Sequence, residues 1–243
     1  GSLKMFWTPQ KKGSQSEEYH IIYKEKSMSS DYADAIVSVQ EFLTRHVKDA
    51  KVNRHSLDQS KYLRKELFQN NIVILIDGIH EVSGFDEFCR DVGIPYSFSQ
   101  EEELKLLRWR ESGSMEAGLA FVSKKEKETT NFAFSLLTRI VHPETGKLII
   151  ILNGGNKFAI PGSARFLTAA SNGDSARNAL YLDFGRLNRE VNAYQLILEV
   201  TQDDKSQRQL EALHLGAWHP FQVTTESLNK AIHRLYDATI LLK

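Results

Sequence analysis

The chain has very little cysteine and no excess of charge of either sign, and both features exclude classes of protein. Cys89 is the only cysteine among 243 residues, so no disulfide can form within the chain and no cysteine-rich metal site exists. This composition is typical of the reducing cytoplasm, where we place the protein. Lys and Arg together number 31, as do Asp and Glu together, so the formal net charge is zero. The overall basic field of a dedicated nucleic-acid-binding protein is missing, and we do not expect nucleic acid as a partner.

Long hydrophobic runs are also absent. The longest aliphatic runs, "IVILI" at residues 72–76 and "LIIIL" at 148–152, have the length of strands, whereas a membrane-spanning helix needs about 20 apolar residues. The first residues do not have the charged-then-apolar pattern of a signal peptide. We therefore predict no membrane association.

Residues 8–18 are poor in core-forming side chains. We interpret "GS" at residues 1–2 as a tag remnant, and the polar stretch up to residue 18, with its Pro and Gly, as a flexible lead-in. Residues 19–243 are predicted to form a single domain. An effector domain fused to this domain, or binding it as a partner, is compatible with this division.

Apolar patterns along the chain alternate between strand and helix. Strands are predicted at 19–24, within 50–57, and at 71–78, 94–98, 118–124, 131–143, 148–152, 178–184 and 193–202, and helices at 29–47, 60–69, 84–93, 99–112, 161–168 and 227–242. This alternation indicates an α/β domain, with a sheet flanked by helices. The turn "PETGK" between two of the strands predicts an antiparallel hairpin, so the sheet is expected to be mixed and mostly parallel. The helix over 99–112 rests on the Ser99 cap and the acidic residues after it, within a segment, 99–130, that we expect to be irregular.

Two segments of the chain repeat one pattern. Each has five aliphatic residues, then Asp or Asn, then Gly, a short loop and a helix, so that Asp77 matches Asn153, Gly78 matches Gly154 and His80 matches Asn156. In an open α/β sheet, loops that follow parallel strands meet at one edge, where ligands usually bind. The repeat therefore predicts a ligand-binding edge, although most strand-to-helix corners in such sheets are empty.

The order of these segments, over about residues 19–202, resembles a group of poorly characterised Rossmann-like modules in bacterial signalling and regulatory proteins. The matching residues are Leu137, Arg139, Gly154, Gly155, Gly162, Ser163 and Ala164. The sequence departs from the group's pattern at the first corner, which reads Asp77-Gly78-Ile79 instead of Gly-Gly-Pro, and at Ser163, where threonine is expected. The resemblance implies a Rossmann-like fold and a sensor-like role, and it implies no reaction.

The second corner, "NGGNKFAIPGSARF", has features of an anion site. Gly154 and Gly155 can turn backbone N–H groups toward a ligand, and a helix starting at Pro161 leaves the N–H groups of the next residues free to bind an anion. Lys157 adds positive charge. The spacing matches neither of the two established glycine-rich phosphate motifs, so an ordinary turn before a capped helix is the alternative.

The favoured function is a non-catalytic ligand-sensing or regulatory module that binds a small anionic, nucleotide-derived molecule. No cofactor, metal or catalytic residue is predicted. The predicted ligand-binding residues are Asp77, Gly78, His80, Asn153, Gly154, Gly155, Asn156, Lys157 and Ser163.

Two other functions are alternatives. A nucleotide- or NAD-directed hydrolase would use Asp77, His80 or Glu81 as acid–base groups. A plain protein-interaction domain, including a homodimer, would leave both corners empty. The only close histidine pair, His214 and His219, has no nearby third ligand in the sequence, and we interpret Cys89 as a buried, unreactive thiol on a helix.

Overall fold

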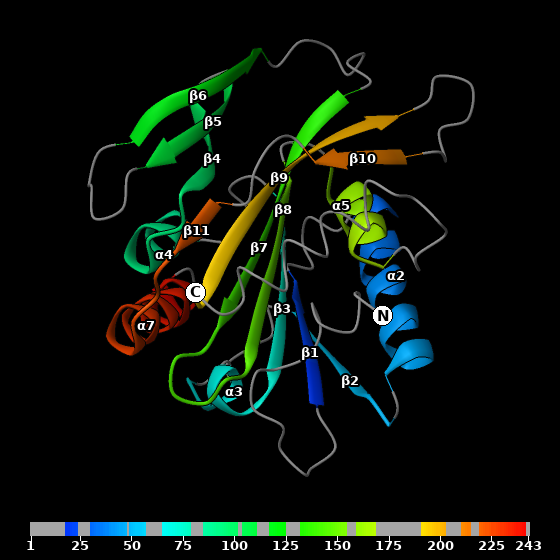
Figure 1. The fold of residues 1–243 in the computed structure, drawn as a ribbon, viewed down its shortest axis with the longest axis vertical. Coiled ribbons are helices and arrows are strands. Elements are labelled where there is room, and N and C mark those ends of the chain that lie inside the picture. Colours follow the sequence, from blue (N-terminus) through cyan, green and yellow to red (C-terminus); the bar gives the residue numbers. More distant parts are fainter. Residues whose placement is uncertain are drawn as a thin grey trace.

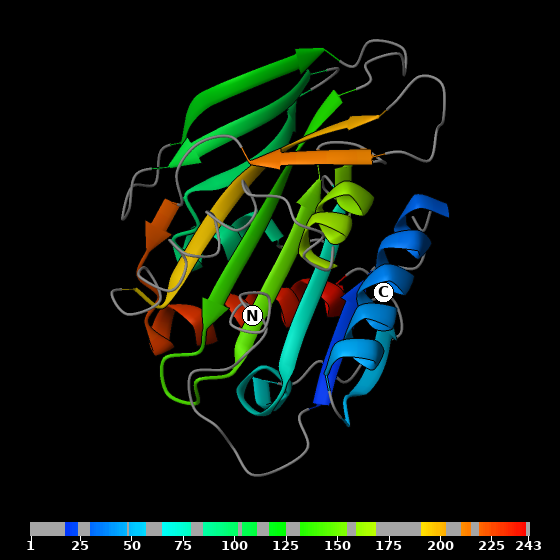
Figure 2. The ribbon, with the colours of Figure 1, turned by 45° about the vertical axis from the view of Figure 1, so that its right-hand side comes forward.

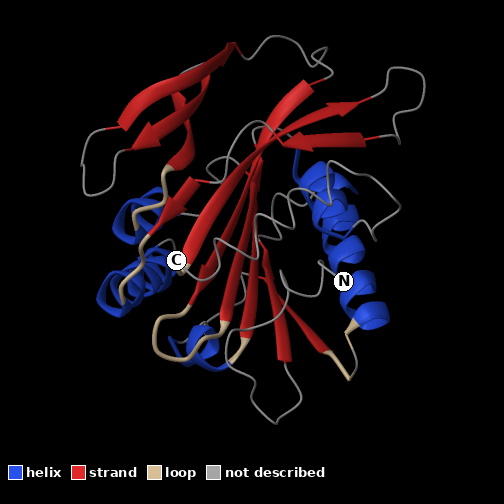
Figure 3. Cartoon of the chain, in the orientation of Figure 1, coloured by secondary structure: helices blue, strands red, loops and turns tan. Residues whose placement is uncertain are grey.

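In the computed structural model the described residues are 18–23, 30–47, 49–56, 65–78, 85–101, 104–110, 117–124, 132–154, 159–168, 191–202, 210–214 and 219–241. They form an α/β structure in which helices cover both faces of a mixed eight-stranded sheet, and a separate three-stranded antiparallel sheet lies beside it (Figures 1 and 3). The strands of the large sheet are β1 (Glu18–Tyr23), β2 (Lys51–Ser56), β3 (Ile72–Gly78), β7 (Phe132–Val141), β8 (Leu148–Gly154), β9 (Ala193–Gln202), β10 (Leu210–His214) and β11 (His219–Phe221). The helices are α2 (Ser30–His46), α3 (Lys65–Asn70), α4 (Phe85–Val92), α5 (Ala159–Thr168) and α7 (Thr225–Leu241).

The large sheet is parallel on one side and antiparallel on the other. Its order is β10-β9-β7-β8-β3-β1-β2, with β11 pairing to β9. Strands β2, β1, β3 and β8 run parallel, and the continuous aliphatic runs of β3 and β8 are typical of parallel strands that are buried on both faces. Strand β7 joins β8 through the predicted hairpin, and β9, β10 and β11 extend the antiparallel side.

Alternate residues of the central strands pack into two separate cores. Ile72, Ile74 and Ile76 of β3 face α2 and α5, which pack against each other on one side of the sheet. Val73 and Leu75 face the opposite layer, which contains α3, α4 and α7. Figure 2 shows α2 and α5 in front of the sheet and α7 behind it. Every residue of β8 is buried, so this strand lies at the centre of both cores.

Helix α5 approaches the sheet closely, and glycine makes this possible. A Cβ atom added to Gly162 would lie 2.3 Å from Cγ1 of Val200 on β9. The Ser163 hydroxyl, on a fully buried side chain, donates a hydrogen bond to the Ile160 carbonyl at 2.9 Å. The helix therefore packs through a surface of small residues, "PGSA".

The small sheet contains β4 (Tyr96–Glu101), β5 (Leu104–Arg110) and β6 (Ala117–Lys124), and one side chain joins it to the large sheet. The Gln195 amide accepts a hydrogen bond from the Tyr96 N–H at 2.8 Å and donates to the Tyr96 carbonyl at 3.0 Å, as a neighbouring strand would. It also donates to the Thr138 hydroxyl at 3.0 Å. Beside these bonds Phe98 packs on Leu136, so polar and apolar contacts together hold β4 against β7 and β9.

Helix α7 is held at its start and along its length. The Asn192 side chain donates to the Val223 carbonyl at 2.7 Å and accepts from the Val223 N–H at 3.0 Å, just before the helix begins. Further along, Asp91 of α4 forms ion pairs with Lys230 at 3.2 Å and Arg234 at 2.8 Å. These contacts fix α4 and α7 as one layer.

Most of the predicted elements are confirmed where the structure describes the chain. Gly93 ends α4 with a φ of 80°, and Gly146 has a φ of 70° in the hairpin turn before β8. The helix predicted over 99–112 is wrong, because these residues form the end of β4 and the strand β5. Strand β5 pairs with neighbours on both sides, and Glu101 pairs with Leu104, so Ser99 and the residues that follow it up to Glu101 belong to a paired strand and do not cap a helix. The segment 99–130 is accordingly less irregular than predicted, and the strand predicted at 178–184 lies outside the described residues.

We predict that Gly162→Ala lowers the free energy of unfolding by about 1–3 kcal/mol, because the added methyl group would overlap Val200. Alanine favours a helix by up to about 1 kcal/mol over glycine, so the overlap must outweigh this gain. Urea unfolding of single and double variants measures the effect. The double variant Gly162→Ala/Val200→Ala should lose less stability than the sum of the two single losses; simple additivity would show that the two residues do not clash.

We also predict that Gln195→Leu lowers the free energy of unfolding by about 1–3 kcal/mol, because it leaves both backbone groups of Tyr96 without partners. Hydrogen exchange should become faster in β4 than in β3. The exposed Gln222, substituted in the same way, serves as the control and should leave both measurements unchanged. Equal protection of β4 in the wild type and in the Gln195 variant would contradict the proposed link.

Candidate functional site

The two repeated corners of the sequence lie side by side. Asp77 of β3 pairs with Asn153 of β8, and Gly78 pairs with Gly154, so the parallel strands end in register. After these strand ends the chain continues to opposite faces: β3 leads to α4, in the layer of α7, and β8 leads to α5, in the layer of α2. Strand β1, on the other side of β3, also leads toward the α2 layer. Divergence of neighbouring connections at the carboxyl ends of parallel strands creates the crevice in which open α/β sheets bind ligands.

Asn153 has an unusual environment at this edge. Its side chain is only 7% exposed, and its Oδ1 atom is buried without a hydrogen-bond partner in the described part of the chain. Its backbone carbonyl accepts a hydrogen bond from the buried Ser135 hydroxyl at 2.8 Å. A buried acceptor without a donor costs about 1–3 kcal/mol of stability. The backbone at this position is therefore fixed, while the side-chain oxygen can accept a hydrogen bond from a bound molecule.

Gly154 has a packing role. A Cβ atom at this position would lie 2.6 Å from Cγ1 of Ile160 and 3.1 Å from Cβ of Ala159. Any larger residue would push the first turn of α5 away from the strand end. The glycine thus lets the helix begin directly beside β8.

The remaining predicted site residues either lie away from the strand ends or lie outside the described residues. Ser163 belongs to the second turn of α5, because the helix begins at Ala159 and not at Pro161. The N–H groups that a helix leaves free belong to its first turn, so the backbone of Ser163 is not among them, and its side chain is buried. His80, Glu81, Gly155, Asn156 and Lys157 lie outside the described residues.

Arg139, one of the residues that carry the resemblance, is a core residue. It is 1% exposed, and its Nη1 donates to the Tyr194 hydroxyl at 2.9 Å, while its guanidinium lies 5.5 Å from the centre of that ring. Burial lowers the pKa of Arg139 and raises the pKa of Tyr194. Arg139 pairs with Ile150, four residues before the end of β8, so it supports the sheet and does not line the edge.

The other candidate residues, a cysteine and two histidines, either lie where the sequence predicts or form no metal site. Cys89 is a buried free thiol on α4, as predicted. His219 of β11 packs its ring against Tyr96, with the ring centres 4.6 Å apart, whereas His214 belongs to β10. Within the described ranges, three or more His, Cys, Asp or Glu residues nowhere gather in a way that would hold a metal ion.

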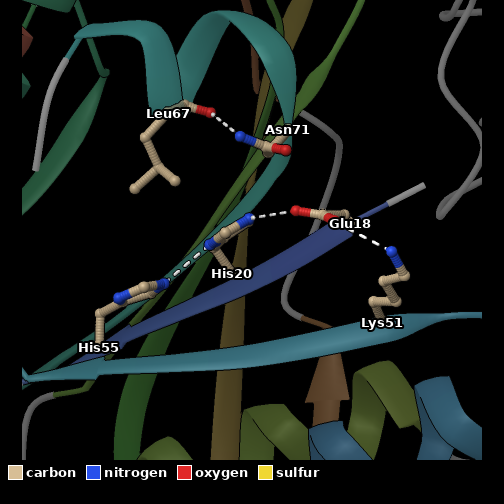
Figure 4. A network of polar contacts seen from close by, with 6 residues as sticks. All are labelled: Glu18, His20, Lys51, His55, Leu67 and Asn71. Atoms are coloured by element: carbon tan, nitrogen blue, oxygen red, sulfur yellow. Dashed lines mark hydrogen bonds and ion pairs between the residues drawn. The ribbon is translucent and has the colours of Figure 1, made fainter. Parts of the chain in front are cut away.

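One polar cluster was not identified from the sequence. His20 of β1 and His55 of β2 are hydrogen-bonded to each other, and Glu18, Lys51 and Asn71 lie around them (Figure 4). The two histidines are 35 residues apart, and only the register of β1 with β2 brings them together. In the sequence they are single polar residues in short strands, and no local pattern could have identified the pair.

Comparisons with known proteins assign the chain to no family: no protein-family model matches it, and no curated protein matches its sequence. The described helices include none long and apolar enough to cross a membrane. Fold and site together define an α/β protein with a mixed sheet and two strand ends aligned at one edge.

We predict that Asn153→Leu leaves the free energy of unfolding unchanged or raises it by up to about 1–3 kcal/mol in the absence of ligand, because it removes a buried acceptor that has no donor. Asn192→Leu is the matched comparison, since the Asn192 amide makes two hydrogen bonds to Val223. That variant should lose about 1–3 kcal/mol. Urea unfolding measures both, and an equal loss in the two variants would show that Asn153 is as well satisfied as Asn192.

Proposed function

We propose that the chain is a non-catalytic ligand-sensing or regulatory module, built as a single Rossmann-like domain, that binds a small anionic, nucleotide-derived molecule at the carboxyl ends of β3 and β8. The observation that carries this proposal is the alignment of the two strand ends, Asp77 with Asn153 and Gly78 with Gly154, where the chain departs to opposite faces. The resemblance to bacterial signalling modules supports the same role.

The unpartnered oxygen of Asn153 refines the ligand. An acceptor buried in this way is satisfied by a hydroxyl or amino group, so the bound molecule carries a hydrogen-bond donor as well as an anionic group. A nucleotide has both. In this proposal Asn153 accepts from the ligand's donor, Lys157 pairs with its anionic group, and Asp77, His80 and Asn156 make further contacts.

The backbone roles follow from the packing. Gly154 is occupied by its contact with Ile160, and Ser163 is buried inside α5, so we assign the backbone donor role to Gly155. In the same proposal Gly78, which has no side chain, leaves space at the first corner next to Gly155. We place this module in the cytoplasm, where ligand binding would be transmitted to a fused or partner effector domain.

We predict that a thermal-shift screen with nucleotides, dinucleotides and cyclic oligonucleotides finds a stabilising ligand. At 100 times its Kd a ligand adds about 2.7 kcal/mol, which corresponds to a rise in Tm of roughly 5–10 °C for a chain of this length. Lys157→Ala should reduce the rise at the same ligand concentration. Lys147→Ala, the same change at the opposite end of β8, should leave it intact.

Two results would overturn the proposal. One is a panel in which no compound raises Tm. The other is a stabilising compound that acts equally on the wild type and on the Lys157→Ala and Asn153→Leu variants. Chemical turnover of the bound nucleotide, lost in His80→Ala, would replace the sensor with the hydrolase alternative.

A further inference from the structure

His20 and His55 form a direct bond between two imidazole rings. Nδ1 of His20 lies 2.8 Å from Nε2 of His55 (Figure 4). The ring centres are 5.0 Å apart and the ring planes differ by 14°, so the rings lie edge to edge in nearly one plane. In the parallel register Ile22 pairs with His55, which makes the two histidines diagonal neighbours on the face that carries α3.

This bond depends on how many protons the pair carries. In the neutral pair one ring donates its N–H and the other accepts with a lone pair. One added proton preserves the bond, because an imidazolium can still donate to a neutral imidazole. A second proton places one N–H against another and two positive charges beside each other, so the bond is lost.

The surroundings of His20 compensate a positive charge only in part. The side chain is buried, and its Nε2 has no hydrogen-bond partner among the described residues; the nearest Glu18 oxygen lies 3.7 Å away. The Glu18 carboxylate also interacts with a second partner, because Lys51 lies 3.5 Å from its other oxygen. Asn71, directly after α3, donates its amide to the Leu67 carbonyl at 3.2 Å. The charged residues with described side chains on β1 and β2 are Glu18, Lys51 and Arg54.

The titration of the pair follows from this environment. Burial, and then the charge of His55, lower the pKa of His20, while Glu18 and Asn71 oppose the shift. Burial also lowers the pKa of His55. Because both folded-state pKa values lie below the ordinary value of 6.5, the unfolded chain binds more protons as the pH falls through about 6.5. The stability of the folded state is therefore complete above this pH and decreases below it.

Strand β2 depends on this bond more than other strands would, because it is the edge of the sheet. It pairs only with β1 in the described part of the chain, and Ser56 is its only buried residue. We propose that the His20–His55 pair is a proton-sensitive attachment that holds β2 on the sheet at neutral pH and releases it in acid. This conformational device is independent of the ligand-binding edge.

The test compares wild type with His20→Gln and His55→Gln, two variants that each remove one of the two titrating rings and in which glutamine can still donate to the remaining histidine. We measure Tm at pH 7.5 and 5.5, and hydrogen exchange of the β2 and β3 amides at both pH values, corrected for intrinsic exchange. In the wild type, each unit by which a folded-state pKa lies below its unfolded value makes the folded-to-unfolded ratio about tenfold smaller in acid. This change lowers Tm by roughly 3–5 °C. Exchange of β2 should increase in acid while β3 stays protected.

Both variants should lose less Tm between the two pH values than the wild type. The control is His233→Gln, an exposed histidine on α7, which should behave as the wild type does. If neither variant folds at pH 7.5, nitrogen NMR titration of the wild-type imidazoles replaces them, and both rings should stay neutral to below pH 6.5. Unchanged acid loss in the variants, equal protection of β2 at both pH values, or ordinary titration of both rings would overturn the proposal.

Discussion

The pairing of β3 with β8 is the constraint on which the rest of the structure depends. The middle of both strands is aliphatic, Ile72–Ile76 in β3 and Leu148–Leu152 in β8, so polarity there does not distinguish one register from another. The residues at the strand ends determine the register. A shift by one residue in one direction would move Asn153 deeper among the aliphatic side chains, and a shift in the other would move Lys147 toward the core. Neither polar group would find a partner there. The close contact of Gly154 with Ile160 fixes the same register from the side of α5.

Once this pair is fixed, the other features follow from topology. The hairpin places β7 next to β8, and α5 and α4 must leave the two adjacent strand ends toward opposite layers. The same alignment that completes both cores therefore places the carboxyl ends of β3 and β8 side by side, at the point where the chain departs toward opposite layers. A ligand site at this edge requires no further architecture, only suitable side chains, and Asn153 is one that the core itself does not satisfy.

The sequence predicted what is local and failed where pairing decides. Aliphatic runs identified the central strands, and the repeated Asp/Asn-Gly pattern placed both strand ends at one edge of the sheet, but it did not predict that Asp77 pairs with Asn153. The helix expected from Ser99 is a strand, because β5 pairs on both of its sides and this pairing outweighs a cap-like run of polar residues. The start of α5 at Ala159 and the contact between His20 and His55 depend on packing and strand register, which no single segment records.

Buried polar groups beside the sheet are of two kinds. Arg139 is bonded to Tyr194 and Ser163 to Ile160, so these groups serve packing. On the face that carries α3, α4 and α7, His20 of β1 and Asn153 of β8 each have a buried polar atom without a hydrogen-bond partner in the described part of the chain, with β3 between them. Natural cores rarely retain such atoms, since each lowers stability, and they concentrate where a ligand or a proton completes them. A proton at His20 and a ligand at Asn153 would complete these two atoms.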